Sequence, residues 1–354
     1  TLENMGRLER YRGHFLNWYD THNLEPLPPE YVSTVDSGNL AACLLALKQG
    51  FQPLLHEPLL RWQRWQGLLD ALGVLAELVE GLEGGAPFQA HLAHIRQQVL
   101  AVRDEPGRWV PLLAGLSSDG LKQLDQQLMS LIEVASHDLE AETLHNLRIW
   151  SERVHHHLLD MQRKLDLLLP WLLPLSRPPA LFSQAEFDPI ITDAWQALHN
   201  ALVAIPQLDK ARTVCNAGKT QLQRLQVLLA DGRGAAPDRR RAKLFEEARA
   251  WCNALADGLD SAQVAAETSL IDIQDLSIPV EAYSQAMDFS FLFDAQRQVF
   301  CLGYRVSGEE RDSNHYDLLA SESRIASLVA IAKGEVPQSH WLHLARPITR
   351  IDHT

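Results

Sequence analysis

The longest stretch of this chain, residues 56–275, is a succession of amphipathic helical patterns, and it leaves room for little else. Leu, Ala, Gln and Arg dominate the stretch, and all four favour helix. Short breaks rich in glycine and proline divide it at 83–87, 104–107, 176–179 and 231–234. We find no repeat of fixed period. The pattern predicts a mainly α fold in which residues 56–280 form a helical bundle.

The first 55 residues have a different texture. A short helix leads into an aromatic turn, and a loop with three prolines, Pro26, Pro28 and Pro29, excludes regular helix. Ser33 then resembles a helix N-cap, with Asp36 in the first turn where the helix dipole favours a carboxylate. Leucines at helical spacing follow, and we expect Gly50 to end this helix.

Residues 281–354 change texture again. The runs 289–293 and 299–306 are strand-like, and the residues between them can turn, which predicts one small β-hairpin. Asp312, Ser313 and Asn314 offer caps for a helix expected from about 315 to 333, ended by Gly334.

Charge and composition exclude several classes of partner. The net charge is −13, so nucleic acid is a poor partner, whereas a neutral sugar polymer is compatible. The most apolar run, 165–175, contains two prolines and is shorter than the roughly 20 residues that span a bilayer, so we expect a soluble segment without direct membrane insertion. The four cysteines form no metal-like spacing and are expected to be reduced, mostly buried thiols.

The ends of the sequence carry a further expectation. Thr1 opens directly onto a helical pattern, no signal peptide is present, and the last residues have no closing element. We therefore expect the chain to be a piece cut at both ends.

Glu322 is the first candidate for chemistry. In the expected helix it shares a face with Leu318, Leu319, Ile325 and Ala326, so the carboxylate should point inward. A buried carboxylate has a raised pKa unless it is paired, which suits a general acid. The alternative is a structural ion pair, for example with Arg324. Asp317 could likewise belong to a site or only to the helix terminus.

Aromatic and polar residues gather near the turns. Sugars stack their C–H faces on aromatic rings and offer hydroxyls to polar groups, and both kinds of partner occur here: Trp18, Tyr19, Asp20, Asp36, Ser37, Asn39 and Tyr316. The alternative is that the aromatics anchor a core and the polar groups cap helices.

Neither histidine nor arginine runs indicate a cofactor. His155, His156 and His157 are consecutive, and consecutive residues of a helix point in different directions, so we assign no metal site. The run 239–241 is expected to be a solvated helix start. No phosphate loop, dinucleotide fingerprint or nucleophile elbow occurs, so we expect no cofactor.

Two stretches resemble cyclic β-1,2-glucan synthases. They are RYRGHFLNWYDTHNLEPLPPEYVSTVDSGNLAACLLALKQG (10–50) and DFSFLFDAQRQVFCLGYRVSGEERDSNHYDLLASESRIASLVAIAKGEVPQSHW (288–341). Both are long and idiosyncratic. The segment between them resembles the family only in position and character. The family usually has NLAGHL where this chain has NLAACL, so residues 42 and 43 are left out of the expected site.

The resemblance implies a fold and a reaction. The family consists of large bacterial inner-membrane enzymes that polymerise glucose from UDP-glucose, close the linear glucan into a ring, and trim it with a phosphorylase-type part. The chain matches the start of the central cyclising domain, which resembles glycoside hydrolases with an (α/α)6 barrel. Residues 1–55 would be its first part, 281–354 the hairpin and the truncated start of the barrel, and the whole would lie at the cytoplasmic face of the membrane.

Residue roles also follow from the resemblance. Ring closure would be a retaining transglycosylation with two carboxylates, Glu322 of the YDLLASE motif being one and the second lying beyond Thr354. The expected partners are a β-1,2-glucan chain and the other synthase domains. The fragment alone is expected to be inactive. The substrate-binding candidates are Trp18, Tyr19, Asp20, Asp36, Ser37, Asn39, Tyr316, Asp317 and Arg324. The alternative is a helical scaffold module without chemistry of its own.

Overall fold

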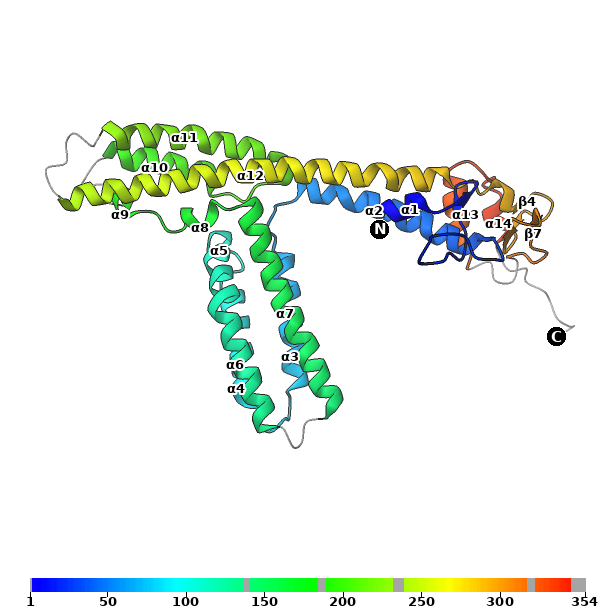
Figure 1. Cartoon of the computed structure of the whole chain (residues 1–354), viewed down its shortest axis with the longest axis horizontal. Helices are drawn as coiled ribbons and strands as arrows, with labels where there is room; N and C mark the ends of the chain where they lie inside the picture. The colour runs from blue at the N-terminus through cyan, green and yellow to red at the C-terminus, as the bar shows by residue number, and fades with distance from the viewer. Residues whose placement is uncertain (1, 136–139, 184–188, 232–238, 317–321, 345–354) are drawn as a thin grey trace, which may run out of the picture. The chain divides into compact units, whose positions relative to one another are not determined.

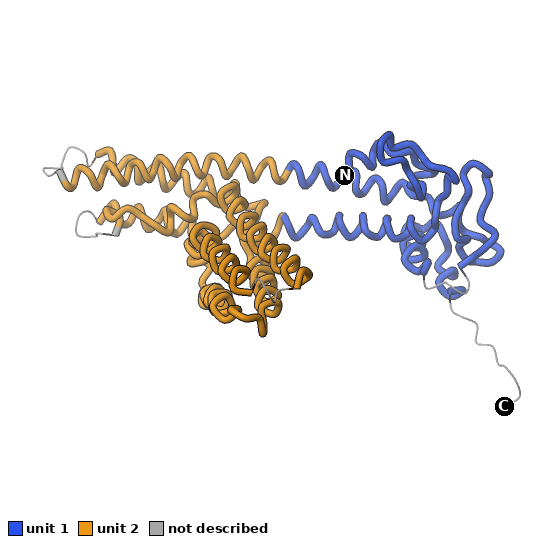
Figure 2. Tube along the Cα trace, turned by 60° about the horizontal axis from the view of Figure 1, so that its bottom comes forward, with its two compact units in different colours: residues 1–54, 271–354 blue, residues 55–270 orange. Residues whose placement is uncertain are grey.

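The computed structural model describes residues 2–135, 140–183, 189–231, 239–316 and 322–344. These residues are mainly helical, which confirms the predicted fold class, and the elements are drawn in Figure 1. The chain forms two compact units (Figure 2). Unit 1 comprises 1–54 and 271–354, and unit 2 comprises 55–270. The two stretches that carry the family resemblance therefore belong to one unit.

Unit 1 combines short strands with helices from both ends of the chain. Its elements are α1 (Leu2–Arg7), β1 (Arg10–Tyr11), β2 (His14–Phe15), β3 (Tyr31–Ser33), most of α2 (Thr34–His56), the end of α12 (Arg239–Ala286), a 3-10 turn (Ser290–Leu292), β4 (Phe293–Asp294), β5 (Val299–Phe300), β6 (Gly303–Arg305), β7 (Glu310–Arg311), α13 (Arg324–Ala332) and α14 (His340–His343).

A three-stranded antiparallel sheet joins the two stretches of unit 1. Its order is β3-β6-β7, and Val32 of β3 lies opposite Tyr304 of β6. The Thr34 hydroxyl, at the start of α2, donates to the carbonyl of Cys301 at 2.8 Å. The core of unit 1 is shared in the same way, since Val32, Ala41, Phe289 and Phe300 are all buried in one apolar cluster.

The start of α2 follows the sequence closely. The Ser33 hydroxyl accepts a hydrogen bond from the backbone N–H of Asp36 at 3.2 Å, so the predicted N-cap is confirmed. The expected end at Gly50 is wrong, because the helix continues to His56 with Pro53 inside it. A proline in a helix removes one backbone donor, and here α2 tolerates it one turn before its end.

The predicted hairpin is confirmed, with shorter strands than expected. Phe293 pairs with Phe300 and Asp294 with Val299. The Asp294 carboxylate accepts from the backbone N–H groups of Gln296 and Arg297, at 2.8 and 3.0 Å, and so fixes the turn. Residues 290–292, expected as strand, form the 3-10 turn, and β6 leaves the hairpin to pair with β3 and β7.

The helix expected from 315 to 333 is only partly present. Residues 317–321 lie outside the described residues, and α13 begins at Arg324, after a turn at 322–323. His315 instead bridges to Cys301 in extended pairing, so the backbone there is not helical. The predicted spacing between Glu322 and the leucines at 318 and 319 falls on residues outside those that the structure describes.

Unit 2 consists of helices around one apolar core. They are α3 (Trp62–Leu78), α4 (Gly85–Ala101), α5 (Pro106–Gly115), a π-helical turn (Leu116–Gly120), α6 (Leu121–Val134), α7 (Ala141–Leu168), α8 (Leu172–Leu175), α9 (Ala180–Ser183), α10 (Pro189–Leu202), a 3-10 turn (Leu208–Lys210), α11 (Ala211–Asp231) and most of α12.

Each predicted break in unit 2 lies at or beside a helix boundary. The gap between α8 and α9 coincides with the break at 176–179, the gaps before α4 and α5 overlap the breaks at 83–87 and 104–107, and α11 ends at Asp231, where the fourth begins. Leu68, Leu72 and Leu75 of α3 are fully buried at helical spacing. Trp171 is also buried, and its indole N–H donates to the Leu202 carbonyl at 3.2 Å. Amphipathic periodicity thus determines this unit.

Among the described residues, none of the helices combines the length and the apolar character that crossing a membrane requires. The expectation that 281–354 begins an (α/α)6 barrel stays a prediction, as does the assignment of 1–55 to a glucan-cyclising domain.

Candidate functional site

Polar groups from both resembling stretches gather around the buried ring of Tyr316. This ring is 6% exposed, and the Tyr316 backbone N–H donates to the Phe300 carbonyl at 2.8 Å. Burial raises the pKa of the hydroxyl to about 12, and the negative charges of Glu322 and Asp36 add to the effect. Both carboxylates therefore lie within electrostatic range of one hydroxyl, although they are far apart in sequence.

Asp36 belongs to the first turn of α2. Its carboxylate is exposed while its backbone N–H is capped by Ser33. Of the neighbouring candidates, Ser37 is buried and Asn39 is exposed. The first two turns of α2 thus offer Asp36 and Asn39 to solvent, and Ser37 is buried.

Glu322 does not lie where the sequence predicted. It is exposed, in the turn before α13, and Ile325 is 45% exposed, so the expectation that the Glu322 carboxylate points inward is wrong. The physical reason is that α13 begins only at Arg324, two residues after Glu322, so Glu322 is not part of the helix whose spacing was used to orient it. The carboxylate is accessible to a ligand beside Tyr316. Asp317, the neighbouring candidate, lies outside the described residues.

A second tyrosine and carboxylate pair lies at the three-stranded sheet of unit 1. The Tyr31 hydroxyl of β3 donates to the Asp312 carboxylate at 3.2 Å. Burial and the nearby Asp312 charge raise the pKa of Tyr31 strongly, so this phenol stays protonated. Asp312 also contributes to the raised pKa of Tyr316. The surface around the two tyrosines is therefore acidic, with Asp36, Asp312 and Glu322 contributing.

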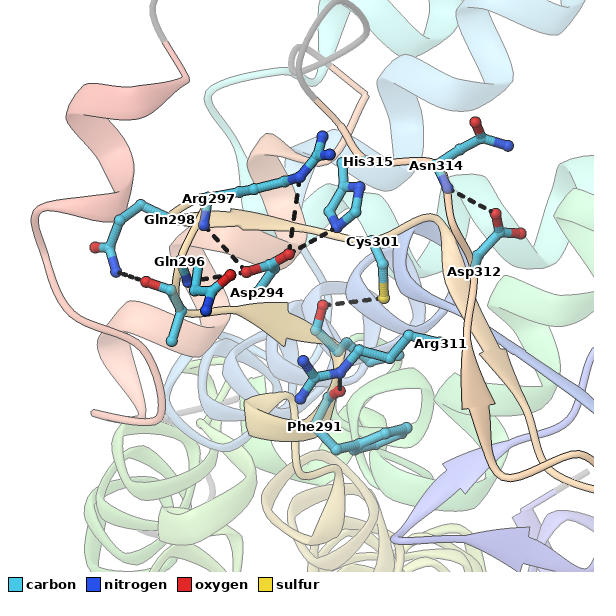
Figure 3. A network of polar contacts seen from close by, with 12 residues as sticks. Phe291, Asp294, Gln296, Arg297, Gln298, Cys301, Arg311, Asp312, Asn314 and His315 are labelled. Carbon is cyan, nitrogen blue, oxygen red and sulfur yellow. Dashed lines mark hydrogen bonds and ion pairs between the residues drawn. The ribbon is translucent and has the colours of Figure 1, made fainter.

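Figure 3 shows a carboxylate–imidazole pair that the sequence analysis missed. Asp294 lies between Arg297 and His315, and its carboxylate contacts the His315 Nε2 at 3.1 Å. Hydrogen bonds from the turn backbone and the His315 ring lower the pKa of Asp294. The other ring nitrogen of His315, Nδ1, is buried and has no hydrogen-bond partner among the residues that the structure describes. No local motif marks this pair, because its two members are 21 residues apart in the sequence.

The aromatic turn at 17–20 has mainly a structural role. The Tyr19 hydroxyl donates to the Glu9 carbonyl and accepts from the Leu16 N–H, both at 2.7 Å. The Asp20 carboxylate accepts from the N–H of His22 at 2.7 Å and closes a local turn. Trp18, by contrast, is 49% exposed and offers a free ring surface.

Arg324 begins α13 and is exposed. Its guanidinium lies 6.0 Å from the ring centre of Trp341, which is also exposed. The alternative of an ion pair between Glu322 and Arg324 has no support among the ion pairs of the described residues.

Two of the three consecutive histidines, His155 and His157, contact different partners. His155 Nε2 lies 2.8 Å from an Asp125 carboxylate oxygen, and His157 Nε2 lies 2.7 Å from the Arg64 carbonyl. Across the described ranges, no group of three or more potential ligands is placed to hold a metal ion.

Comparison with known proteins supports the resemblance and extends it. No family model matches the chain. The chain is 28% identical over 351 residues to the cyclic beta-(1,2)-glucan synthase NdvB of Rhizobium meliloti (strain 1021). The aligned region covers 99% of this chain, so it includes the helical middle, which by inspection resembled the family only in position and character. The resemblance is thereby confirmed: over nearly its whole length the chain is similar to a cyclic β-(1,2)-glucan synthase, and it spans about 9% of that protein.

Proposed function

We propose that this chain is a segment of a cyclic β-1,2-glucan synthase and that unit 1 binds the glucan during ring closure. The observation that carries the proposal is the 28% identity over 99% of the chain to such a synthase. The acidic surface around Tyr316 supports it, because carboxylates accept hydrogen bonds from sugar hydroxyls. The parent enzyme would be a larger glycosyltransferase at the cytoplasmic face of the bacterial inner membrane.

The proposed reaction is a retaining transglycosylation. One carboxylate attacks the anomeric carbon while a carboxylic acid protonates the departing glycosidic oxygen. The 2-hydroxyl at the other end of the same glucan then attacks the glycosyl-enzyme, passes its proton to the second group, and closes the ring. We assign Glu322 to one of these two roles, and its exposure beside Tyr316 is consistent with access to substrate.

The remaining candidates would bind substrate. Asp36 and Asn39 at the start of α2 are exposed and can accept or donate hydrogen bonds to hydroxyls. Trp18 offers a ring for stacking. Tyr31 and Tyr316 stay protonated, since burial raises the pKa of each hydroxyl, and a protonated phenol can donate a hydrogen bond.

A scaffold role for unit 2 is the second proposal. Its favouring observation is that residues 55–270 form a compact unit with an apolar core of their own. A unit of this kind can hold other domains of the synthase without taking part in chemistry.

The test uses the full-length synthase with Glu322→Gln, which keeps the size of the side chain and removes the ionisable group. We expect linear glucan to be made at a normal rate and ring closure to fall by about 100-fold or more, as for a lost acid, base or nucleophile. Mass spectrometry separates the products, because the ring lacks one water. The matched control is Glu246→Gln, an exposed glutamate on α12. Near-normal cyclisation in a folded Glu322→Gln enzyme would remove Glu322 from the reaction.

A further inference from the structure

A groove with two tryptophans lies within unit 2, apart from the residues discussed above. Its volume is about 510 Å³, which is in the range of small-molecule sites. Its walls come from three segments of unit 2. They are residues 57–63, which lead into α3, the first turn of α5, and residues 203–205 after α10. Leu60 and Ile205 contribute apolar surface. Figure 1 labels α3, α5 and α10, the helices that contain these residues or adjoin them along the chain.

The two indoles present ring surface to the groove. Trp109 is 6% exposed, and its N–H already donates to the Val102 carbonyl at 2.8 Å. Trp62 is half-buried, and the ring centres are 6.2 Å apart with the planes tilted by 42°. Arg103 lies over Trp62 at 5.6 Å. The Trp109 N–H is therefore unavailable, and this ring can contribute only its apolar and π surface.

Hydrogen-bond donors and acceptors both occur on the wall formed by residues 57–63. The Glu57 carboxylate forms an ion pair with Arg61, and Gln63 adds an amide. A carboxylate accepts hydrogen bonds, a guanidinium donates them, and an amide does both. Because the two charges offset each other, the groove does not favour an ionic ligand.

The loops that form the groove are held in place by backbone contacts. The Leu59 N–H donates to the Pro206 carbonyl at 3.0 Å, and Pro58 pairs with Gln207 in an isolated bridge. Pro106 starts α5. A site held in this way loses little conformational freedom on binding.

We infer that this groove binds a neutral glucose unit of a glucan chain, with a C–H face of the sugar on Trp62 and its hydroxyls on Glu57 and Arg61. The groove has aromatic surface beside a few hydrogen-bond donors and acceptors, and the charges of Glu57 and Arg61 offset each other. These features match a ligand with an apolar face and a hydroxylated edge. The inference rests on the proposed function, and it assigns unit 2 a glucan-holding site away from the reaction. Apolar ligands are the main competing occupants.

The experiment is isothermal titration calorimetry of the purified chain with linear β-1,2-gluco-oligosaccharides. We expect Trp62→Ala to weaken binding by about tenfold or more, the size of a hot-spot truncation. Trp150→Ala is the matched control, because Trp150 is also half-buried in unit 2 beneath an arginine, Arg153, at 4.3 Å. Circular dichroism checks that both variants fold. Glu57→Gln, which removes the carboxylate and keeps the size, should also weaken binding.

The outcomes separate this inference from the proposed function. Binding that is weakened about tenfold in Trp62→Ala and kept in Trp150→Ala supports the groove. Binding that Trp62→Ala leaves unchanged overturns the groove and leaves the proposed function standing. The groove inference also fails if the chain binds no glucan, or if an apolar dye such as anilinonaphthalene sulfonate occupies the groove and glucan does not displace it. In these cases the cyclisation assay of Glu322→Gln still decides the proposed function.

Discussion

Gly38 of α2 lies directly against Ala326 of α13, so closely that a Cβ atom on residue 38 would come within 2.5 Å of the Ala326 Cβ and 2.6 Å of its Cα. Part of this contact is backbone, which cannot rotate away. We therefore expect Gly38→Ala to force the two helices apart and to lower the free energy of unfolding by about 1–3 kcal/mol. Urea unfolding followed by circular dichroism measures the change.

Gly50→Ala is the control for this substitution. Gly50 lies in the same helix and is exposed, with nothing within 4 Å of an added Cβ. Alanine is the better helix former, so we expect Gly50→Ala to stabilise the protein by up to about 1 kcal/mol. Equal effects of the two substitutions would show that the contact between α2 and α13 is looser than described.

Acid should destabilise the protein through His14. This ring is fully buried, its Nε2–H donates to the Asp288 carbonyl at 2.8 Å, and the rings of Phe289 and Phe291 pack against it. Burial lowers its pKa from 6.5 to about 4, and the Lys333 charge acts in the same direction. The unfolded chain binds a proton near pH 6.5 and the folded protein only near pH 4. This stability is therefore fully present above pH 6.5 and is lost as pH falls towards 4, by up to about 3 kcal/mol.

The measurement is urea unfolding between pH 7.5 and 4.5, above the range where most carboxylates titrate. His14→Gln should flatten the dependence, whereas the exposed His22→Gln should leave it unchanged. Some slope will remain, because burial also lowers the pKa of His340 and His91. An unchanged slope in His14→Gln would contradict the assignment.

Thiol reactivity should separate Cys43 from the other cysteines. Cys43 is exposed on α2, whereas Cys215, Cys252 and Cys301 are buried. Burial raises the pKa of these three thiols to about 11, 12 and 11, respectively. Because the thiolate is the reactive form, we expect Ellman's reagent at pH 8 to modify one thiol per native chain quickly. Cys43→Ser should remove this phase, and the other three should react only after denaturation.

The chain by itself should not cyclise linear β-1,2-glucan. It spans about 9% of the synthase that it resembles, and a retaining mechanism needs two correctly spaced carboxylates. Incubation of purified 1–354 with linear glucan, followed by mass spectrometry, tests this. Cyclic product from the chain alone would mean that both carboxylates lie within it.

Helix content and breaks were predictable because they depend on local signals. The periodic leucines of α3 and the cap at Ser33 act over a few residues, and both predictions are confirmed. The pairing of β3 with β6 was not predictable, since strands of three residues leave almost no pattern. The prediction from periodicity was wrong at Glu322, because it assumed one helix from about residue 315. In the structure His315 forms a β-bridge and Glu322 lies in a turn. Asp294 and His315 meet because His315 bridges to Cys301 beside the hairpin, and no local pattern indicates this contact.

The pairing of the two ends of unit 1 has a consequence for synthesis on the ribosome. Thr34 finds its partner Cys301 267 positions later. At typical translation speeds, β3 is synthesised on the order of 10 to 50 s before β6, the strand that pairs with it. Unit 2, whose contacts are complete by residue 270, can fold in that interval. During this interval the nascent chain exposes an unpaired β3 edge and the apolar residues that residues 10–50 contribute to the core of unit 1. We therefore expect residues 10–50 to be the stretch that depends most on a chaperone.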